Sequence, residues 1–358
     1  MDFLSLTLED LRDELERLGE PRYRAEQICS WVYQHRAGKF EDMSNLPSGL
    51  RTKFAEQFTL RPLAKAGETG SKDTTRKFLF RLEDGQLIET VLIPASPSLY
   101  GERADRRTVC ISSQVGCAYG CKFCASGLDG WKRNLSAGEI VAQFLAVEEL
   151  SGEKINNIVF MGMGEPFANY DNLLRAITII NAQWGLGLGA RHMTVSTSGL
   201  APRIRDFAEQ PLQVRLAISL HGATDDVRGK IMPVNRKHPL EELMEACAHY
   251  TSRKKQHLTF EYILIRGVND TDEQAHALAR HARRLKAKIN LIPYNTVTGL
   301  EWERPEESVQ EHFLKLVVDQ GAFATLRREK GHDIAAACGQ LRLQTLRENP
   351  VAQSDAVG

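Results

Sequence analysis

The sequence has few cysteines, no excess of charge of either sign and no long apolar segment. Seven cysteines in 358 residues are both sparse and odd in number, so a disulfide framework of the secreted kind is not expected. Lysine plus arginine and aspartate plus glutamate each number 46, which gives no global basic signal for nucleic acid. No apolar run approaches the ~20 residues of a membrane-spanning helix.

The composition is that of an ordinary folded protein, with 42% hydrophobic and 26% charged residues. The length suits one large domain or two to three smaller ones. The first residues, MDFLSLTLEDLRDELERLG, are acidic and amphipathic, which fits neither a secretory signal nor a transit peptide. We therefore expect a cytoplasmic protein in a reducing compartment, without a membrane partner.

The most informative feature is a C-x3-C-x2-C motif formed by Cys117, Cys121 and Cys124. Three closely spaced thiolates can hold three irons of a [4Fe–4S] cluster and leave the fourth iron open, whereas stable electron-transfer clusters usually take four thiolates. In one large enzyme class the open iron binds S-adenosylmethionine (SAM). A structural zinc site needs a further pair of Cys or His ligands, so zinc is the weaker alternative.

The first 60 residues predict a small helical domain. One helix is expected over residues 7–18 with Thr7 as its cap, a second from Pro21, and a third from Pro47 to about residue 58. Basic side chains on these helices could face RNA, although from composition alone a solvated helix surface is the better interpretation. We assign residues 1–60 to an accessory, RNA-binding domain.

Residues 61–106 predict a linker and a β-hairpin. Two strands with alternating apolar residues flank Asp84-Gly85, a strong hairpin signal. In the second strand Glu89 shares a face with apolar residues. Burial there would raise the pKa of Glu89 and suit it to proton transfer. An exposed carboxylate on an edge strand is at least as good an interpretation of the pattern alone.

Residues 107–330 alternate strands and helices, which predicts a parallel sheet with right-handed crossovers. Strands are expected at 108–113, 157–161, 192–197, 213–220, 259–265, 288–293 and 323–326, and helices at 136–150, 170–182, 202–209, 240–252, 272–286 and 305–319. About six βα units indicate an incomplete barrel, whose active site lies at the carboxyl ends of the strands. Directly after strands come the cysteine loop and the segments MGMGEP, STSG, SLHG and IPYN, as a bound cofactor requires.

These motifs together resemble a known family. The cysteine motif, MGMGEP and SLH resemble radical SAM enzymes. More narrowly, CISSQVGCAYGCKFC, STSG, IMPVN, INLIPYN and GHDIAAACGQL resemble the RlmN/Cfr family of radical SAM RNA adenine methyltransferases, and most closely its RlmN type. The similarity extends from about residue 5 to about Leu341. It implies an α/β fold, a partial (β/α)6 radical SAM barrel with a small N-terminal helical domain and a β-hairpin extension.

The resemblance also implies roles for individual residues. Cys117, Cys121 and Cys124 would ligate the single [4Fe–4S] cluster. The positions that match SAM-binding residues are Gly164, Glu165, Ser196, Ser219, Leu220, His221 and Asn295. In a C-terminal catalytic segment, residues 331–345, Cys338 matches the cysteine that becomes S-methylated. Cys110 matches the second catalytic cysteine, and Glu89 matches the proton acceptor. Residues 346–358 are expected to be a disordered tail.

The implied activity is methylation of adenosine C2 in 23S rRNA, at the peptidyl transferase centre, and in tRNA at position 37. Adenine C2 is a poor nucleophile, so a thiolate is expected to accept the methyl group first. Cys338 would take it from one SAM, a second SAM would generate the radical, and the methylene radical on Cys338 would add to the ring. Glu89 would remove the ring proton. Cys110 would then attack the sulfur of Cys338, which releases RNA and leaves a Cys110–Cys338 disulfide.

Two alternatives remain open at this point. A Cfr-type enzyme would methylate adenine C8 of 23S rRNA, conferring antibiotic resistance, with the same catalytic residues. A non-catalytic iron–sulfur RNA-binding module is the alternative from another class, but it would not need Cys338, Cys110 and Glu89 together. An electron donor such as a flavodoxin system is required, and a monomer is expected. The basic run from Arg280 to Lys288 is a candidate phosphate contact.

Overall fold

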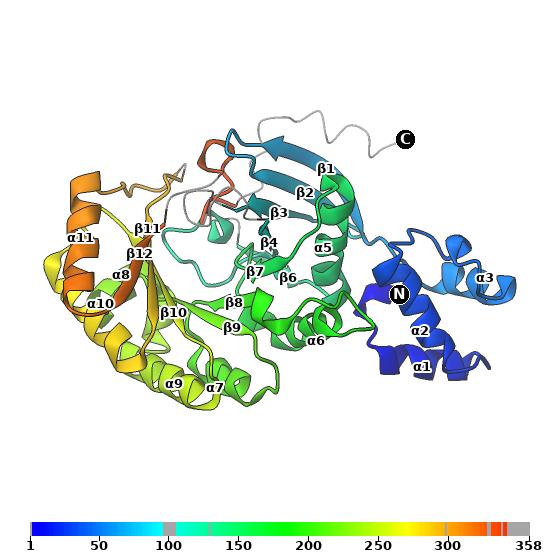
Figure 1. Cartoon of the computed structure of the whole chain (residues 1–358). Helices are drawn as coiled ribbons and strands as arrows, with labels where there is room; N and C mark the ends of the chain where they lie inside the picture. Colours follow the sequence, from blue (N-terminus) through cyan, green and yellow to red (C-terminus); the bar gives the residue numbers. More distant parts are fainter. Residues whose placement is uncertain are drawn as a thin grey trace.

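The chain is built around one ten-stranded sheet with helices along its outer face and a separate group of helices at the N-terminus (Figure 1). The computed structural model describes residues 2–95, 105–128, 130–297, 299–327, 331–337 and 339–341. Cys338 and the predicted tail, residues 346–358, lie outside the described residues. Within the described part, no helix is both long and apolar enough to cross a membrane.

The N-terminal helices are α1 (Leu8–Arg17), α2 (Arg24–Cys29) and α3 (Ser48–Gln57), and α2 continues into a π-helical turn, η2 (Ser30–Gln34). All three predicted helices are confirmed. Thr7 caps α1 as expected, in a reciprocal box in which the Asp10 carboxylate accepts a hydrogen bond from the Thr7 backbone at 2.8 Å. The apolar face of α1 is buried through Leu11 and Leu15, which explains its position against the other helices.

Four antiparallel strands form one end of the sheet: β1 (Leu63–Gly70), β2 (Arg76–Leu82), β3 (Leu87–Pro94) and β4 (Arg107–Cys110). The predicted hairpin is confirmed as β2 and β3. Because β3 also pairs with β4, the hairpin continues the barrel sheet directly. The edge strand β1 was not predicted, since LAKAGETG has little apolar alternation and stays largely exposed; its charged side chains are typical of a protected edge.

The remaining strands pair in parallel from β4 onward. They are β7 (Asn157–Phe160), β8 (Met193–Thr197), β9 (Arg215–Ser219), β10 (Thr259–Leu264), β11 (Lys288–Pro293) and β12 (Phe323–Leu326). The crossover helices are α5 (Ala137–Ser151), α6 (Tyr170–Asn181), α7 (Ala201–Glu209), α9 (Leu240–Arg253), α10 (Asp272–Leu285) and α11 (Glu307–Asp319). Among the described strands β1 and β12 remain the two edges, so the predicted incomplete barrel is confirmed.

Short elements complete the fold. A short helix after β9, α8 (Asp225–Ile231), was not predicted because its seven residues carry too little periodicity. Single turns are η1 (Phe3–Ser5), η3 (Phe40–Asp42), η4 (Ala125–Gly127), η5 (Pro166–Asn169), η6 (Ala190–His192), η7 (Pro233–Arg236) and η8 (His332–Ile334). A separate two-stranded sheet pairs β5 (Gln114–Gly116) with β6 (Trp131–Asn134).

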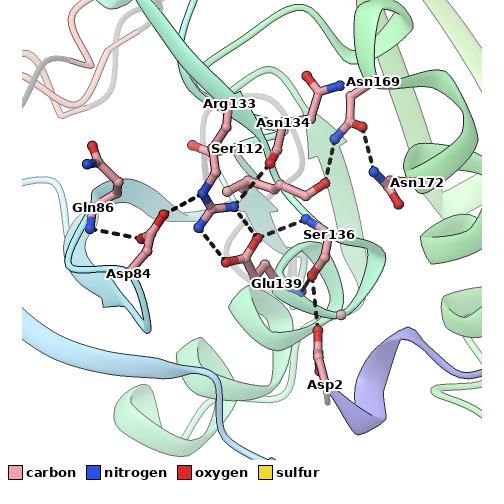
Figure 2. Close-up of polar contacts among 12 residues, drawn as sticks. Asp2, Asp84, Gln86, Ser112, Arg133, Asn134, Ser136, Glu139, Asn169 and Asn172 are labelled. Carbon is pink, nitrogen blue, oxygen red and sulfur yellow. Dashed lines mark hydrogen bonds and ion pairs between the residues drawn. The ribbon is translucent and has the colours of Figure 1, made fainter.

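Helix α5 connects the N-terminal helices to the sheet. A capping box opens it, with Ser136 at the N-cap and Glu139 reaching back. The Ser136 hydroxyl also donates to the Asp2 carboxylate at 3.0 Å (Figure 2). A Cβ atom at Gly138 would lie 1.9 Å from an Asp2 carboxylate oxygen, so glycine permits this close approach. The N-terminal group is thereby held against the start of α5.

Candidate active site

The carboxyl ends of the parallel strands and the loops beside them surround a cavity, the usual place for a bound ligand in a βα barrel. The residues predicted for cofactor binding that line it are Cys117, Cys121, Cys124, Gly164, Glu165, Ser196, Ser219 and His221. The cysteines come from the β5–β6 connection, and Gly164 and Glu165 from the loop after β7. Ser196 lies near the end of β8, Ser219 is the last residue of β9, and His221 follows it. The expected gathering of polar residues at the carboxyl ends of the strands is therefore observed.

The three cysteines of the motif lie on the connection between β5 and β6. Gly116 allows the two strands to close, because a Cβ atom there would lie 1.9 Å from the Gly130 carbonyl oxygen. Burial raises the pKa of the Cys117 thiol to about 12 and raises the pKa of Cys121 well above its ordinary value, so without a metal these thiols hold their protons. Among the described residues no three Cys, His, Asp or Glu side chains converge tightly enough for one ion. A four-iron cluster does not require such convergence, because each of the three thiolates would bind a different iron.

Arg133 on β6 joins this cysteine hairpin to the β2–β3 turn and to α5 (Figure 2). Its guanidinium donates to Asp84, in the β2–β3 turn, at 2.6 Å and to both carboxylate oxygens of Glu139, in α5, at 2.8 Å. Paired hydrogen bonds of this kind fix orientation as well as distance. The orientation of the cysteine loop therefore depends on the β2–β3 turn, which is distant in sequence, and on α5, which follows β6 directly.

Glu165 points its carboxylate along the cavity wall. Its oxygens accept hydrogen bonds from the backbone N–H of Phe167 at 3.0 Å and of Ser198 at 2.6 Å. Burial raises the pKa of this carboxyl above its ordinary value, although the two backbone donors favour the charged form. The preceding Gly164 has a φ of +99°, and a Cβ atom there would lie 2.6 Å from the Gln114 side chain, so the turn requires glycine.

The next two strands contribute serines and a histidine. The hydroxyls of Ser196 and Ser219 lie 3.4 Å apart. His221 accepts a hydrogen bond at Nδ1 from the Ile263 backbone at 3.1 Å and meets Phe123 edge to face at 4.5 Å between ring centroids. Burial lowers the pKa of His221 to about 3, so its ring is neutral at physiological pH.

Leu220 and Asn295 are placed differently from the other predicted cofactor-binding residues. Both are buried, at 0% and 2% exposure, and neither is among the described residues that line the cavity. The Leu220 backbone N–H donates to the Glu261 carbonyl oxygen at 3.0 Å. Any role of Leu220 in cofactor binding would thus be exerted through its position between Ser219 and His221.

Glu261 is a cavity residue that the sequence analysis missed. It lies in one register row with Ser219, Asn290 and Thr325 across four strands. Asn290 donates to one carboxylate oxygen at 3.0 Å, and Thr325 donates to Asn290 at 3.1 Å. The other oxygen of Glu261, like the Ser198 hydroxyl, is buried without a hydrogen-bond partner in the described structure. The available signal was one glutamate within the apolar run TFEYIL.

The cavity fits a cluster and a polar cofactor. Three thiols supply the donor set for a cluster with an open iron. Unpaired buried polar atoms are costly, and Ser198 and Glu261 present such atoms at the cavity. A ligand with hydroxyl and amino groups would satisfy them.

A second group of predicted residues lies on the antiparallel part of the sheet. Cys110, at 8% exposure, packs with Val91, Met163, Ala336 and Leu341. The C-terminal segment is held there by backbone and side-chain hydrogen bonds from η4. The Ala125 N–H donates to the Gly339 carbonyl at 2.7 Å, and the Ser126 hydroxyl to that of Leu341 at 2.8 Å. The residues that flank Cys338 in sequence are thus close to both the cysteine loop and Cys110.

Glu89 belongs to this second group. Its side chain is 0% exposed, so the interpretation as an exposed edge-strand carboxylate is wrong. The reason is that β1 and β2 continue the sheet on one side while β4 continues it on the other. The Glu89 carboxylate forms an ion pair with the Lys77 ammonium at 3.0 Å. A buried carboxylate near Cys110 is thereby established.

Comparison with known proteins places this geometry in a family. The model of the radical SAM superfamily matches residues 111–279, and that of the ribosomal RNA large subunit methyltransferase N-terminal domain matches residues 1–60. A probable dual-specificity RNA methyltransferase RlmN from Akkermansia muciniphila is 52% identical over 342 residues, 96% of this chain and 95% of that protein. Its counterpart RlmN 3 from Opitutus terrae is 54% identical over 355 residues, with coverage of 96% and 95%.

The chain belongs to the RlmN family of radical SAM methyltransferases. The crystal structure of a radical SAM methyltransferase from Sphaerobacter thermophilus, 46% identical, superposes with a TM-score of 0.90 over 96% of this chain and 99% of that one. The predicted radical SAM fold and the resemblance to RlmN are both confirmed. Membership of the radical SAM superfamily implies SAM and an iron–sulfur cluster as cofactors, which the cavity fits.

Proposed function

We propose that this RlmN-family enzyme methylates C2 of adenosine in 23S rRNA and in tRNA at position 37. The observation that carries the proposal is the proximity of two residue groups. The cavity lined by the cysteine motif and the group around Cys110 and Glu89 both contact the segment that contains Cys338. An RNA-binding module without catalysis would not require this arrangement.

Cys117, Cys121 and Cys124 would hold the single [4Fe–4S] cluster. The cavity residues Gly164, Glu165, Ser196, Ser219 and His221 would hold SAM, with Leu220 and Asn295 in supporting positions. When bound, the cluster and SAM supply a methyl group and a carbon-centred radical. Two molecules of SAM are consumed for each methyl group transferred to RNA.

The protein's own residues would then carry the methyl group. The Cys338 thiolate accepts the methyl group as a thioether. When bound, the cluster and SAM would remove one hydrogen atom from that thioether and would accept one electron after its carbon has bonded to adenine C2. The Glu89 carboxylate takes the proton from C2. The Cys110 thiolate attacks the sulfur of Cys338, so that a disulfide forms and the carbon–sulfur bond breaks. The released carbon keeps the bonding electron pair and takes up a proton, which completes the methyl group on RNA.

The test is anaerobic reconstitution with SAM, a reductant and unmodified 23S rRNA or tRNA, followed by nucleoside mass spectrometry. A 2-methyladenosine peak from both RNAs supports the proposal. An 8-methyladenosine peak would instead indicate the Cfr-type reaction. No methylated adenosine from an enzyme that has its cluster and cleaves SAM would refute the substrate assignment.

Two further expectations belong to this proposal. A flavodoxin system would supply electrons, and purified flavodoxin with its reductase should support turnover in place of a chemical reductant. The enzyme should act as a monomer, which light scattering of the reconstituted protein would measure. The cavity and the Cys110 group are both formed within one chain.

A further inference from the structure

The ion pair between Lys77 and Glu89 is buried on both sides. The side chains are 9% and 0% exposed, and the ammonium nitrogen lies 3.0 Å from a carboxylate oxygen. The two residues lie on neighbouring strands, where Leu79 of β2 pairs with Glu89 of β3 and Lys77 pairs with Val91. Lys77 therefore approaches Glu89 diagonally across one face of the sheet, within reach of a long side chain.

The location of this pair is informative because burying two charges is costly. A hydrophobic pair of similar size is often as stable as a buried ion pair, so such pairs are weak evidence for a purely stabilising role. An opposite charge within about 4–6 Å lowers the pKa of a carboxyl by roughly 1–3 units, whereas burial without a partner raises it. A carboxylate that must accept a proton in a dry site therefore benefits from an adjacent cation.

Lys77 also contacts the C-terminal segment. Its ammonium donates to the Ala335 carbonyl oxygen at 3.4 Å. Lys77 shares one register row with Val91 and Cys110. One side chain therefore contacts the buried carboxylate and the segment that contains Cys338, while lying in register with the second cysteine.

We propose that Lys77 is a positioning residue that keeps Glu89 ionised and orients it toward the C-terminal segment. This inference rests on the proposed function in assigning Glu89 as the proton acceptor. Lys77 itself transfers no proton and acts only through the Glu89 carboxylate. Its effect is to lower the pH at which Glu89 becomes able to accept the proton from adenine C2.

Other ionisable groups surround Glu89, and the test must separate them from Lys77. Those on the described elements packed near it are Arg81 on β2, Cys110 on β4 and Asp333 on the C-terminal segment. Arg81 is exposed, and the Asp333 carboxylate accepts hydrogen bonds from Ser71 and Lys72. On the opposite face, α5 contacts β3 through the uncharged pair Thr90 and Gln143. The ion pair of the carboxylate within the described part of the chain is with Lys77.

The decisive variants are Lys77→Gln, which removes the charge but keeps a hydrogen-bond donor, and Lys77→Arg, which keeps the charge. The measurement is kcat/KM for methyladenosine formation as a function of pH. Loss of the cation should move the acid limb of the Lys77→Gln profile up by about 1–3 pH units. Below that limb the rate should fall about tenfold for each pH unit, and it should recover at high pH. Lys77→Arg should retain the wild-type limb.

The matched control is Lys65→Gln. Lys65 lies on the neighbouring strand β1 and pairs with Glu68 at 2.8 Å, but its side chain is 43% exposed. Its profile should coincide with wild type. A Lys77→Gln enzyme that is slower at every pH, with its acid limb unmoved, would show a merely structural role and overturn the proposal.

A second measurement does not depend on catalysis. Infrared difference spectra report the protonation of Glu89 directly. One spectrum compares the wild-type enzyme with Glu89→Gln, and the other compares Lys77→Gln with the double variant Lys77→Gln/Glu89→Gln. At neutral pH the wild-type background should show a carboxylate band, and the Lys77→Gln background a protonated carboxyl band. A carboxylate in both backgrounds would refute the inference even if the enzyme makes 2-methyladenosine. If Glu89 is protonated in Lys77→Gln but ionised in the wild type, and the wild-type enzyme methylates no RNA, the effect of Lys77 on Glu89 stands and the proposed function is refuted.

Discussion

Replacing Cys110 with alanine should stop the reaction after RNA has become bonded to the protein. In the proposed sequence, Cys110 acts last, when its thiolate attacks the sulfur of Cys338. Without that thiolate, no nucleophile attacks the Cys338 sulfur, so the bond between this sulfur and the RNA-bound carbon stays intact. The expected result is a covalent RNA–protein adduct in place of free methylated RNA.

The cost to stability is small compared with the chemical effect. Cys110 is 8% exposed and packs among Val91, Met163, Ala336 and Leu341, so removing its sulfur leaves a small cavity. Such a deletion costs about 1 kcal/mol, against the roughly 5–15 kcal/mol that stabilises a typical domain. The variant should remain folded. Product release, by contrast, should slow by roughly 1000-fold or more, as when an essential nucleophile is removed.

The assay is a single turnover with radiolabelled RNA, resolved on a denaturing gel and followed by nucleoside mass spectrometry. Cys247→Ala is the matched control, because Cys247 is also buried, at 0% exposure in α9. It should lose a similar amount of stability and still release methylated RNA. If Cys110→Ala also releases methylated RNA at the control rate, without a gel-shifted adduct, the role of Cys110 is refuted.

Three further predictions test other parts of the structure. Cys121→Ala should abolish the iron and sulfide content of reconstituted protein, whereas Cys29→Ala, in the N-terminal core, should leave both unchanged; a cluster retained in Cys121→Ala would contradict the ligand assignment. The pKa of His221 is lowered to about 3 in the folded state from an ordinary value of about 6.5. The unfolded state therefore binds the proton more readily, and stability should fall as pH decreases from about 6.5 toward 3, by at most ~1.4 kcal/mol per pH unit. In urea unfolding, His221→Asn should flatten this dependence, and an unchanged slope would exclude His221 as its source. Thr7→Ala removes the cap of α1 and should lower the free energy of unfolding by about 1 kcal/mol; no change would show that the cap is dispensable.

Local patterns predicted much of the fold. The Thr7 cap of α1 and the turn at Asp84-Gly85 depend on residues close together in sequence, so they could be recognised without tertiary contacts. The strand–helix alternation also predicted where the loops of the active site would lie. Strand β1 and helix α8 escaped prediction because one is polar and exposed and the other is short.

The candidate site was predicted less evenly. The sequence by itself determined the cysteine motif and the glycines of the strand-end loops, since their spacing and conformational demands are local. Only the tertiary structure decided that Glu89 is buried, because an alternating strand can be an edge or an interior strand. It also brought Lys77 to Glu89, and aligned Glu261 with Asn290. These contacts depend on the register between strands, which is determined when the whole sheet assembles and the side chains of distant segments exclude water together.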